Sequence, residues 1–406
     1  MPPAIYALLI VNFAVGTQGF VFGGVLAEMA HDLGVPVGTA GLAITASAVT
    51  FAIGSPVFAI LLARIERRAV LTAGLAILLA GNLACMLAPG FGVLVALRVL
   101  TGTGAALVGA VGGATAAQLV APEKRGRALA LVLGGLTLAF MLGLPLGSAA
   151  GGTYGWRACF ALSAAITALA LVALLAVMPK VPAIPGPRPS PGALFRVPPV
   201  RAAFATNFLA FAGAFCVVAF TGPLVNQVTG LAGVAVGPFQ ACIGAGSLLG
   251  LAYGGRTADT PRGSTALAAS LMLLLLCQLA YAALLAGWGG AFSAWLLAAT
   301  ILLSAAALFA VVPILQSRLA ALAGAATPLA LALNGSLVSL GQGVGAAIGG
   351  VARNQFGFAA AGLAGAGIVV AAILAGRRVL APPGAALSSV ASARPSAAEA
   401  ASRPAP

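Results

Sequence analysis

Residues 125–157 read RGRALALVLGGLTLAFMLGLPLGSAAGGTYGWR, an apolar segment long enough to cross a lipid bilayer as one helix. Its glycines Gly143, Gly147 and Gly151 recur every fourth residue and therefore share one face of that helix. A face without side chains lets a neighbouring helix come close. Pro145 removes one backbone donor and predicts a kink, which is tolerated in lipid only where protein or a water-filled cavity satisfies the freed carbonyl. We therefore predict a bent helix that packs tightly in a bundle.

Composition places the rest of the chain in the membrane as well. Of 406 residues, 61% are hydrophobic and 6% are charged, and the mean hydropathy is +1.12. About a quarter of the residues of a soluble domain are charged. The apolar blocks predict an all-α polytopic membrane protein with spans at residues 4–26, 38–62, 69–89, 92–120, 128–150, 157–178, 201–225, 233–254, 264–286, 291–312, 328–352 and 357–377.

A proline-rich segment divides these spans into two groups of six. Residues 179–199 contain eight prolines, a composition that favours an extended linker without helix. The tail after Leu380 consists mostly of Pro, Ala and Ser and is predicted to be disordered. The expected organisation is a six-span bundle at 1–178, a cytoplasmic linker at 179–200, a second six-span bundle at 201–380 and a cytoplasmic tail at 381–406.

The basic residues predict the orientation. The formal net charge is +14, which by itself could suggest a nucleic-acid partner. With the N-terminus in the cytoplasm, however, every Lys and Arg except Arg98, Arg157 and Arg353 falls on the inner side. This asymmetry is the positive-inside rule. We expect both termini in the cytoplasm and no nucleic-acid partner.

The two groups of spans look like an internal repeat. Asn12-Phe13 in the first span recurs as Asn207-Phe208 in the seventh, and the glycines of the fifth span recur as Gly341, Gly345 and Gly349 in the eleventh. The two offsets are 195 and 198 residues, which agree closely. Parallel six-span repeats with the binding site between them are typical of one class of transporter.

The glycine segment also resembles a family motif. Gly143-Leu-Pro145-Leu-Gly147, with the basic loop of Glu123, Lys124, Arg125 and Arg127 before it and Gly155-Trp156-Arg157 after it, resembles motif C of major facilitator drug exporters. The resemblance covers about residues 5 to 378 and is closest to drug:proton antiporters of the chloramphenicol-resistance and arabinose-efflux type. It implies a major facilitator fold of two six-helix bundles, alternating access between them, a bacterial inner-membrane location and a monomer.

Arg98 is the basic residue predicted to lie inside a span. Leu97-Arg98-Val-Leu-Thr101-Gly102 resembles motif B of the same family, with Thr101 where Gln is common. An arginine in a span normally faces the bundle interior or a water-filled cavity. By resemblance, Arg98 would handle substrate or protons. The alternative is an arginine that extends to the headgroups at the outer end of the span.

The loop between the second and third spans resembles motif A of the family. It reads Ala63-Arg64-Ile65-Glu66-Arg67-Arg68, so the Asp of the motif is replaced by Ala63 and its second Gly by Glu66. The copy after the eighth span, Gly255 to Asp259, keeps its Asp. The resemblance implies a gating role for Arg64, Arg67, Arg68 and Asp259. Alternatively, these charges only set the topology.

Proton coupling is the least supported part of the resemblance. Related exporters carry an acid in the first span, where this chain has Gln18-Gly19. The six acids of the chain are Glu28, Asp32, Glu66, Glu123, Asp259 and Glu399, and none is predicted in mid-span. Coupling normally needs an intramembrane group that can titrate. Glu28, His31 and Asp32, at the outer end of the first span, are the external candidates.

Uncharged polar and aromatic side chains dominate the helices expected to line a cavity. Amides hydrogen-bond and aromatic rings offer flat apolar surface, which suits a neutral or amphipathic solute. The candidate binding residues are Arg98, Asn12, Gln18, Asn207 and Asn334, and further polar and aromatic candidates are Asn226, Gln227, Gln240, Gln342, Phe13, Phe20, Phe140, Phe208, Phe211 and Phe215.

Together these features predict an exporter of small amphipathic or neutral solutes in the lipid bilayer. The resemblance to major facilitator exporters further implies drug efflux and proton coupling. The alternative is a sugar or metabolite exporter that works by uniport or exchange. Composition leaves a channel or receptor open. We expect no enzyme, because clustered His, Asp or Glu at membrane depth are missing. No cofactor or metal site is expected, since the five cysteines show no ligand spacing.

Overall fold

The computed structural model describes residues 1–121, 124–182 and 191–380, and these residues form helices without any strand. In the first half of the chain the elements are α1 (Pro3–Phe20), η1 (Gly23–Val25), α2 (Leu26–Asp32), α3 (Val37–Ala40), α4 (Leu42–Leu61), α5 (Arg67–Met86), α6 (Phe91–Gln118), α7 (Arg125–Leu138), η3 (Ala139–Gly143), α8 (Leu144–Tyr154) and α9 (Arg157–Val177). In the second half they are α10 (Pro191–Arg196), α11 (Pro198–Val218), α12 (Thr221–Thr229), η4 (Gly233–Val236), α13 (Gly237–Thr257), α14 (Gly263–Leu285), η5 (Gly290–Phe292), α15 (Ser293–Ala323), η6 (Gly324–Ala326), α16 (Thr327–Phe356) and α17 (Phe358–Leu380).

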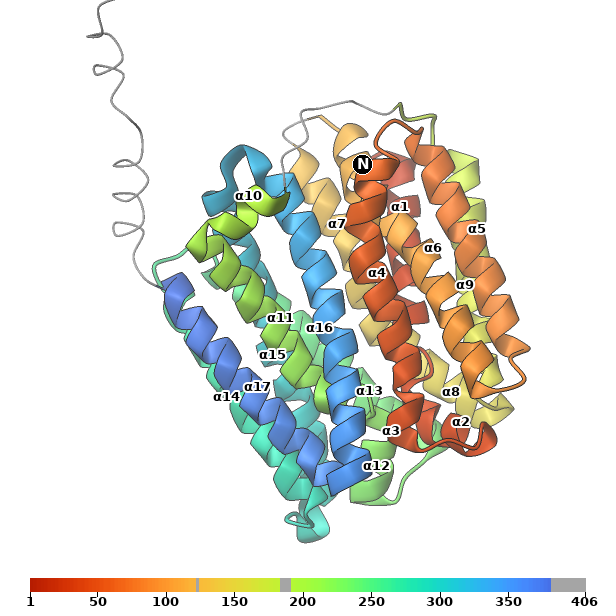
Figure 1. The fold of residues 1–406 in the computed structure, drawn as a ribbon, viewed down its shortest axis with the longest axis vertical. Coiled ribbons are helices and arrows are strands. Elements are labelled where there is room, and N and C mark those ends of the chain that lie inside the picture. The colour runs from red at the N-terminus through yellow and green to blue at the C-terminus, as the bar shows by residue number, and fades with distance from the viewer. Residues whose placement is uncertain (122–123, 183–190, 381–406) are drawn as a thin grey trace, which may run out of the picture.

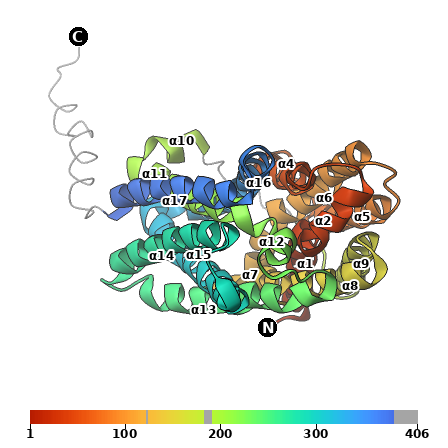
Figure 2. The same ribbon diagram turned by 90° about the horizontal axis from the view of Figure 1, so that it is seen from below.

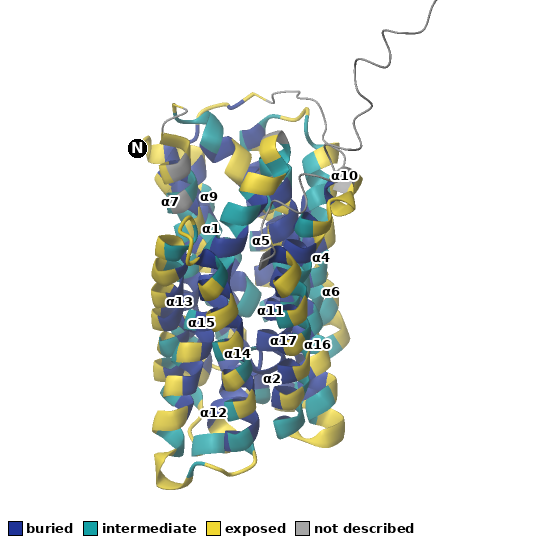
Figure 3. Cartoon of the chain, turned by 90° about the vertical axis from the view of Figure 1, so that its left-hand side faces the viewer, coloured by how far each residue is buried: buried dark blue, intermediate teal, exposed yellow. Residues whose placement is uncertain are grey.

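Twelve helical segments of the described chain are long and apolar enough to cross a membrane, which confirms the predicted fold class. Exposed residues run along the outward faces of the helices (Figure 3). Many of them are large and apolar, such as Leu169, Val172 and Leu363, as on lipid-facing surfaces. The first span is longer than predicted, because it continues from α1 through η1 and α2 to Asp32.

The predicted linker and tail are described only in part. Residues 183–190, the tail at 381–406 and Glu123 lie outside the described residues. The expectation of a linker without helix is wrong at its end, where Pro191–Arg196 form α10. A proline is compatible with the first helical position, since the N–H it lacks has no partner inside the helix.

Contacts between helices fall into two groups. Within residues 1–182, α1 packs on α7 and α9, and α6 packs on α4 and α5. Within residues 191–380, α11 packs on α16 and α17, and α13 packs on α15. We call these groups the N half and the C half. We call the end of the molecule where α1 begins the near end, and the opposite end, with α2, α3 and α12, the far end (Figure 1).

The two halves meet chiefly toward the far end. There α16 packs on α3 and α4, α12 on α2 and η1, and α8 on α13 and η4 (Figure 2). All four hydrogen bonds between the halves in the described structure involve these elements: Gly38 with Asn354, Thr39 with Asn354, Thr45 with Gly343, and Ser148 with Gln240. The halves are therefore closed against each other at the far end.

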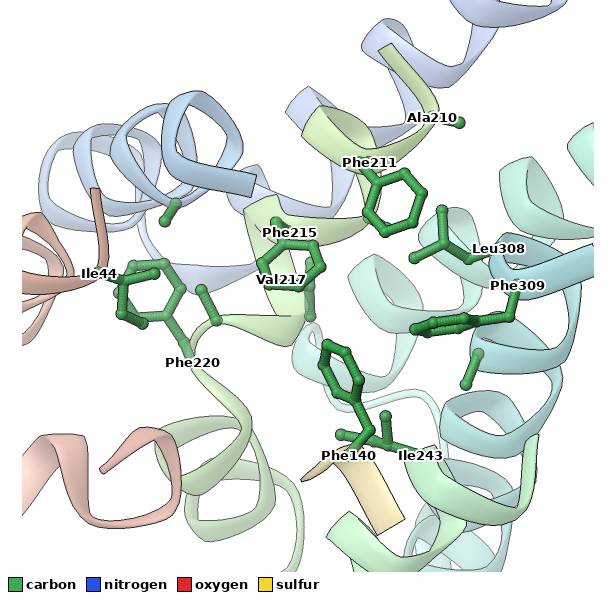
Figure 4. Close-up of a cluster of buried hydrophobic side chains, with 14 of the residues drawn as sticks. Ile44, Phe140, Ala210, Phe211, Phe215, Val217, Phe220, Ile243, Leu308 and Phe309 are labelled. Atoms are coloured by element: carbon green, nitrogen blue, oxygen red, sulfur yellow. The ribbon is translucent and has the colours of Figure 1, made fainter. Parts of the chain in front are cut away.

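The predicted kink at Pro145 takes the form of a π-helical turn. The helix α7 passes through η3, where Leu144 N–H donates to the carbonyl of Ala139, five residues earlier, before α8 continues. The wider turn accommodates the proline, which has no N–H to offer Met141. The turn also places Phe140 between the two halves (Figure 4).

The two glycine series occupy equivalent places. A Cβ at Gly143 or Gly147 would collide with Thr17 or Val21 of the first span. The glycines of α16 meet the seventh span in the same way, since a Cβ at Gly341, Gly345 or Gly349 would meet Phe208, Ala212 or Cys216 of α11. Gly151 approaches Val25 and Cys159. These six glycines therefore pack helices together inside each half.

Candidate binding site and transport pathway

A cluster of five phenylalanines spans the interface between the halves. Phe140 of η3 packs against Phe20 of α1 and Phe309 of α15, with ring centroids 5.6 Å and 5.2 Å apart. The ring centroid of Phe215 of α11 lies 5.2 Å from that of Phe20. The centroids of Phe211 and Phe309 are 6.1 Å apart, and both rings are labelled in Figure 4. Sequence reasoning named four of these residues and missed Phe309, which is one apolar residue in an apolar span.

A small cavity of about 20 Å³, which is room for about one water molecule, adjoins this cluster, so a solute can enter only after the surrounding side chains or the two halves move. Phe140 is the lining residue from the N half, and the rest of the lining comes from the C half. The lining comprises Phe140, Phe215, Val218, Thr221, Leu224, Ile243, Tyr281, Ile301, Ser304, Ala305, Leu308 and Phe309. Hydroxyls of Thr221, Tyr281 and Ser304 are its polar groups, and no lining residue is charged. Such a lining can bind an aromatic or apolar body with an uncharged polar group.

Arg98 is completely buried in the N half. Its Nε donates to the carbonyl of Ala43 at 3.1 Å. One Nη donates to the backbone and side-chain oxygens of Gln18, both at 2.9 Å. The other Nη donates to the carbonyl of Gly19 at 3.2 Å and to the hydroxyl of Ser47 at 2.7 Å. All five donor positions of the guanidinium are therefore used.

These bonds make Arg98 a link between three helices. It lies on α6, and its acceptors belong to α4 and to the C-terminal end of α1, where carbonyls lack partners within the helix. The guanidinium also lies 5.1 Å from the ring centroid of Phe22. Of the two readings from sequence, the headgroup position is wrong, because the side chain is enclosed. Arg98 is also not among the residues that line the aromatic cavity.

The other four predicted binding residues fall into different environments. Gln18 is buried and accepts from Arg98. Asn207 donates to Asn334 at 2.9 Å, and this buried pair joins α11 to α16. Asn12 donates to the carbonyl of Leu8 on its own helix. None of the five lines the aromatic cavity.

The motif A segments lie at the near end. Arg64 is exposed, the N–H of Arg67 donates to the carbonyl of Val181, and Arg68 donates to the carbonyl of Leu175 at 2.9 Å. In the C half, Asp259 accepts from Ser317, next to Arg318. Sequence reasoning missed Ser317, because a single hydroxyl between Gln316 and Arg318 carries no distinctive pattern.

The external acids are divided between two environments. Asp32 forms an ion pair with Arg157 at 2.7 Å and accepts from Trp156 Nε1 at 2.7 Å. This is the only ion pair in the described part of the chain. Glu28 and His31 line a pocket of about 350 Å³ at the far end. None of these three residues lines the aromatic cavity.

Comparison with known proteins agrees with this architecture. Residues 8–327 match the sequence profile of the Major Facilitator Superfamily. The inner membrane transport protein YdhP of Escherichia coli is 32% identical over 85% of this chain and 87% of its own length. A chloramphenicol resistance protein of Streptomyces lividans is 34% identical over 68% of this chain and 71% of its own. A bacterial homologue of the human lysosomal transporter Spinster, solved in an inward-facing and unoccupied conformation, superposes with a TM-score of 0.76 at 17% identity, covering 93% of this chain and 97% of its own.

The repeated helix packing, the twelve spans and the sequence match over most of the chain therefore lead to one conclusion. The chain is a multi-pass protein of the bacterial inner membrane and belongs to the Major Facilitator Superfamily, whose members are membrane transporters and not enzymes.

Proposed function

We propose that this transporter exports small neutral or amphipathic solutes by alternating access of its N and C halves. The observation that carries the proposal is the cavity beside the five-phenylalanine cluster, which has hydroxyl groups and no charge in its lining. A charged solute would lose its hydration there without gaining a partner of opposite charge, which is costly. A neutral aromatic solute with a hydroxyl, amide or carbonyl group matches the chemistry of the aromatic and the hydroxyl-bearing residues of the lining, and the cavity would widen to admit it when the halves move. The chloramphenicol resistance protein among the relatives supports a drug as one such solute.

We propose that the near end faces the cytoplasm. The loop at 64–68 and the linker residues Pro179 to Pro182 lie at that end. They carry Arg64, Arg67, Arg68 and Lys180, and cytoplasmic loops are rich in such basic residues. In this orientation the contacts between the halves close the outer side. The solute would then enter the cavity from the cytoplasm.

A second candidate is uniport or exchange without proton coupling. It is favoured because the guanidinium of Arg98, the charged group deepest in the N half, has only uncharged hydrogen-bond partners. Of the acids in the described residues, Glu28, Asp32, Glu66 and Asp259, none hydrogen-bonds to that guanidinium. Proton-coupled efflux needs such a group.

The experiment has two steps. A strain that overproduces the protein is grown against a panel of neutral, cationic and anionic drugs and sugars to find a solute. The purified protein in liposomes is then assayed for counterflow of that solute, with and without an imposed proton gradient. The proposal expects protection against neutral aromatic compounds and saturable counterflow. Accumulation driven by the proton gradient would favour coupled efflux over exchange, and protection confined to charged compounds would contradict the assignment of the cavity.

A further inference from the structure

The second span begins at a contact with the other half. The N–H of Gly38, in the first turn of α3, donates to Asn354 Oδ1 of α16 at 3.1 Å. The amide of Asn354 in turn donates to Thr39 Oγ1 at 3.3 Å. A side-chain oxygen that accepts from a first-turn N–H stabilises the start of a helix. No residue of the N half provides this oxygen, since Pro36 before the helix has no side-chain acceptor. The cap is therefore supplied by the C half.

Two backbones touch beside this cap. A Cβ at Gly38 would collide with the carbonyl of Gly350, and a Cβ at Gly350 would collide with the carbonyl of Gly38. Further along the same helices, Thr45 Oγ1 donates to the carbonyl of Gly343 at 2.9 Å. The helix α16 thus has a second small-residue face, turned to the N half. Its first face, with Gly349, packs on α11 within the C half.

We propose that Gly38, Thr39, Gly350 and Asn354, which we call the far-end clasp, form the contact that opens and closes in each transport cycle, and that the Asn354 cap sets the ratio of closed to open molecules. This rests on the proposed alternating access. The clasp suits a reversible contact, because a contact between glycine backbones orders no side chains. Asn354 is exposed, so water can replace its partners when the halves separate. The Gly349 contact with α11 stays closed throughout.

Adjacent glycines on α16 offer a matched test. Gly350→Ala places a methyl group against the N half, whereas Gly349→Ala places one against Cys216 of the same half. Both substitutions add the same atom to the same helix and both overpack a contact. The added methyl group contacts the N half in Gly350→Ala and the C half in Gly349→Ala. Only the first substitution should therefore change the ratio of open to closed molecules.

The readout is the distance between the far ends of the halves. Spin labels are attached through Leu87→Cys and Trp288→Cys, both highly exposed at the far end, in the full chain with its five native cysteines replaced, in lipid nanodiscs. No solute is needed, so failure here is separable from failure of the proposed function. We expect Gly350→Ala to raise the open-to-closed ratio roughly 5- to 150-fold. Gly349→Ala should leave the ratio unchanged. An unchanged ratio in Gly350→Ala, or equal opening in Gly349→Ala, would overturn the proposal.

Substitutions of Asn354 test the cap without crowding the contact. Asn354→Ala removes the acceptor and should raise the open-to-closed ratio roughly 2- to 30-fold. Asn354→Asp keeps an oxygen acceptor for Gly38 and should stay within about twofold of the parent, because Asp caps helices as well as Asn. Because Asn354 is exposed, both variants should fold. Equal distance distributions for the Ala and Asp variants would refute the role of the cap.

Discussion

Gln18 offers Arg98 two oxygens at once, its side-chain oxygen and its backbone carbonyl, both 2.9 Å from the same guanidinium nitrogen. The carbonyl belongs to the last turn of α1, which is followed by the irregular residues before η1. A buried cation here is stabilised by dipoles of the helix end rather than by a carboxylate. The contact of Arg98 with Gln18 therefore lies where α1 ends and the first span becomes irregular.

Replacing Arg98 should remove the hydrogen bonds that join α6 to α4 and to the end of α1. Arg98→Gln removes the charge and leaves several buried oxygens without donors, at about 1 to 3 kcal/mol for each. We expect transport to be lost and thermal unfolding in detergent to shift to lower temperature. Arg98→Lys keeps the charge but not the planar fork, and should retain a measurable part of the transport. Wild-type transport by Arg98→Gln would show that the link between α1, α4 and α6 is dispensable.

A carboxylate placed at position 18 should change the chemistry of this pair. Gln18→Glu keeps the length of the side chain and puts a negative charge beside the guanidinium, in a charge-assisted hydrogen bond. A carboxylate paired with a guanidinium stays ionised over a wide pH range. We therefore expect the variant to be produced at the parent level and to keep the pH profile of the parent in counterflow measured from pH 5 to 8. A fall in transport with pH that the parent lacks would show that the carboxylate is not paired with Arg98.

The glycine faces inside each half should not tolerate larger side chains. Gly147→Leu forces a side chain into Val21, and Gly345→Leu forces one into Ala212. Overpacking of this kind costs about 1 to 3 kcal/mol. We expect lower yield, reduced thermal stability and lost transport. Gly134→Leu serves as the control, since a Cβ there meets nothing within 4 Å. Full activity in both test variants would remove the packing role of these glycines.

The proposed orientation can be tested by labelling. Single cysteines replacing the exposed Ile65 and Lys180 in a chain without native cysteines should react with reagents that enter the cytoplasm, and not with impermeant reagents added to intact cells. Leu87→Cys, at the far end, should show the reverse. Labelling of position 65 or 180 from outside would invert the proposed direction of opening.

Sequence predicted the spans well because a bilayer demands long apolar segments and because glycine at every fourth position marks a close helix contact. It could not predict the partners of Arg98, since three of them are the backbone carbonyls of Gln18, Gly19 and Ala43, which any residue carries. The sequence also does not predict the role of Asn354. Its partner Gly38 is 316 residues away, and a polar residue at a span end is common.

The aromatic cavity is the central claim, and substitution of its ring from the N half tests it most directly. Phe140→Ala removes a ring that packs on Phe20 and Phe309, and Phe292→Ala is a control with an exposed ring far from the cavity. In counterflow of a neutral aromatic solute, we predict that Phe140→Ala raises the half-saturation concentration roughly tenfold, as the loss of an aromatic contact implies. The control should match the parent. An unchanged half-saturation concentration in Phe140→Ala, with protein of normal stability, would show that the solute does not bind in this cavity.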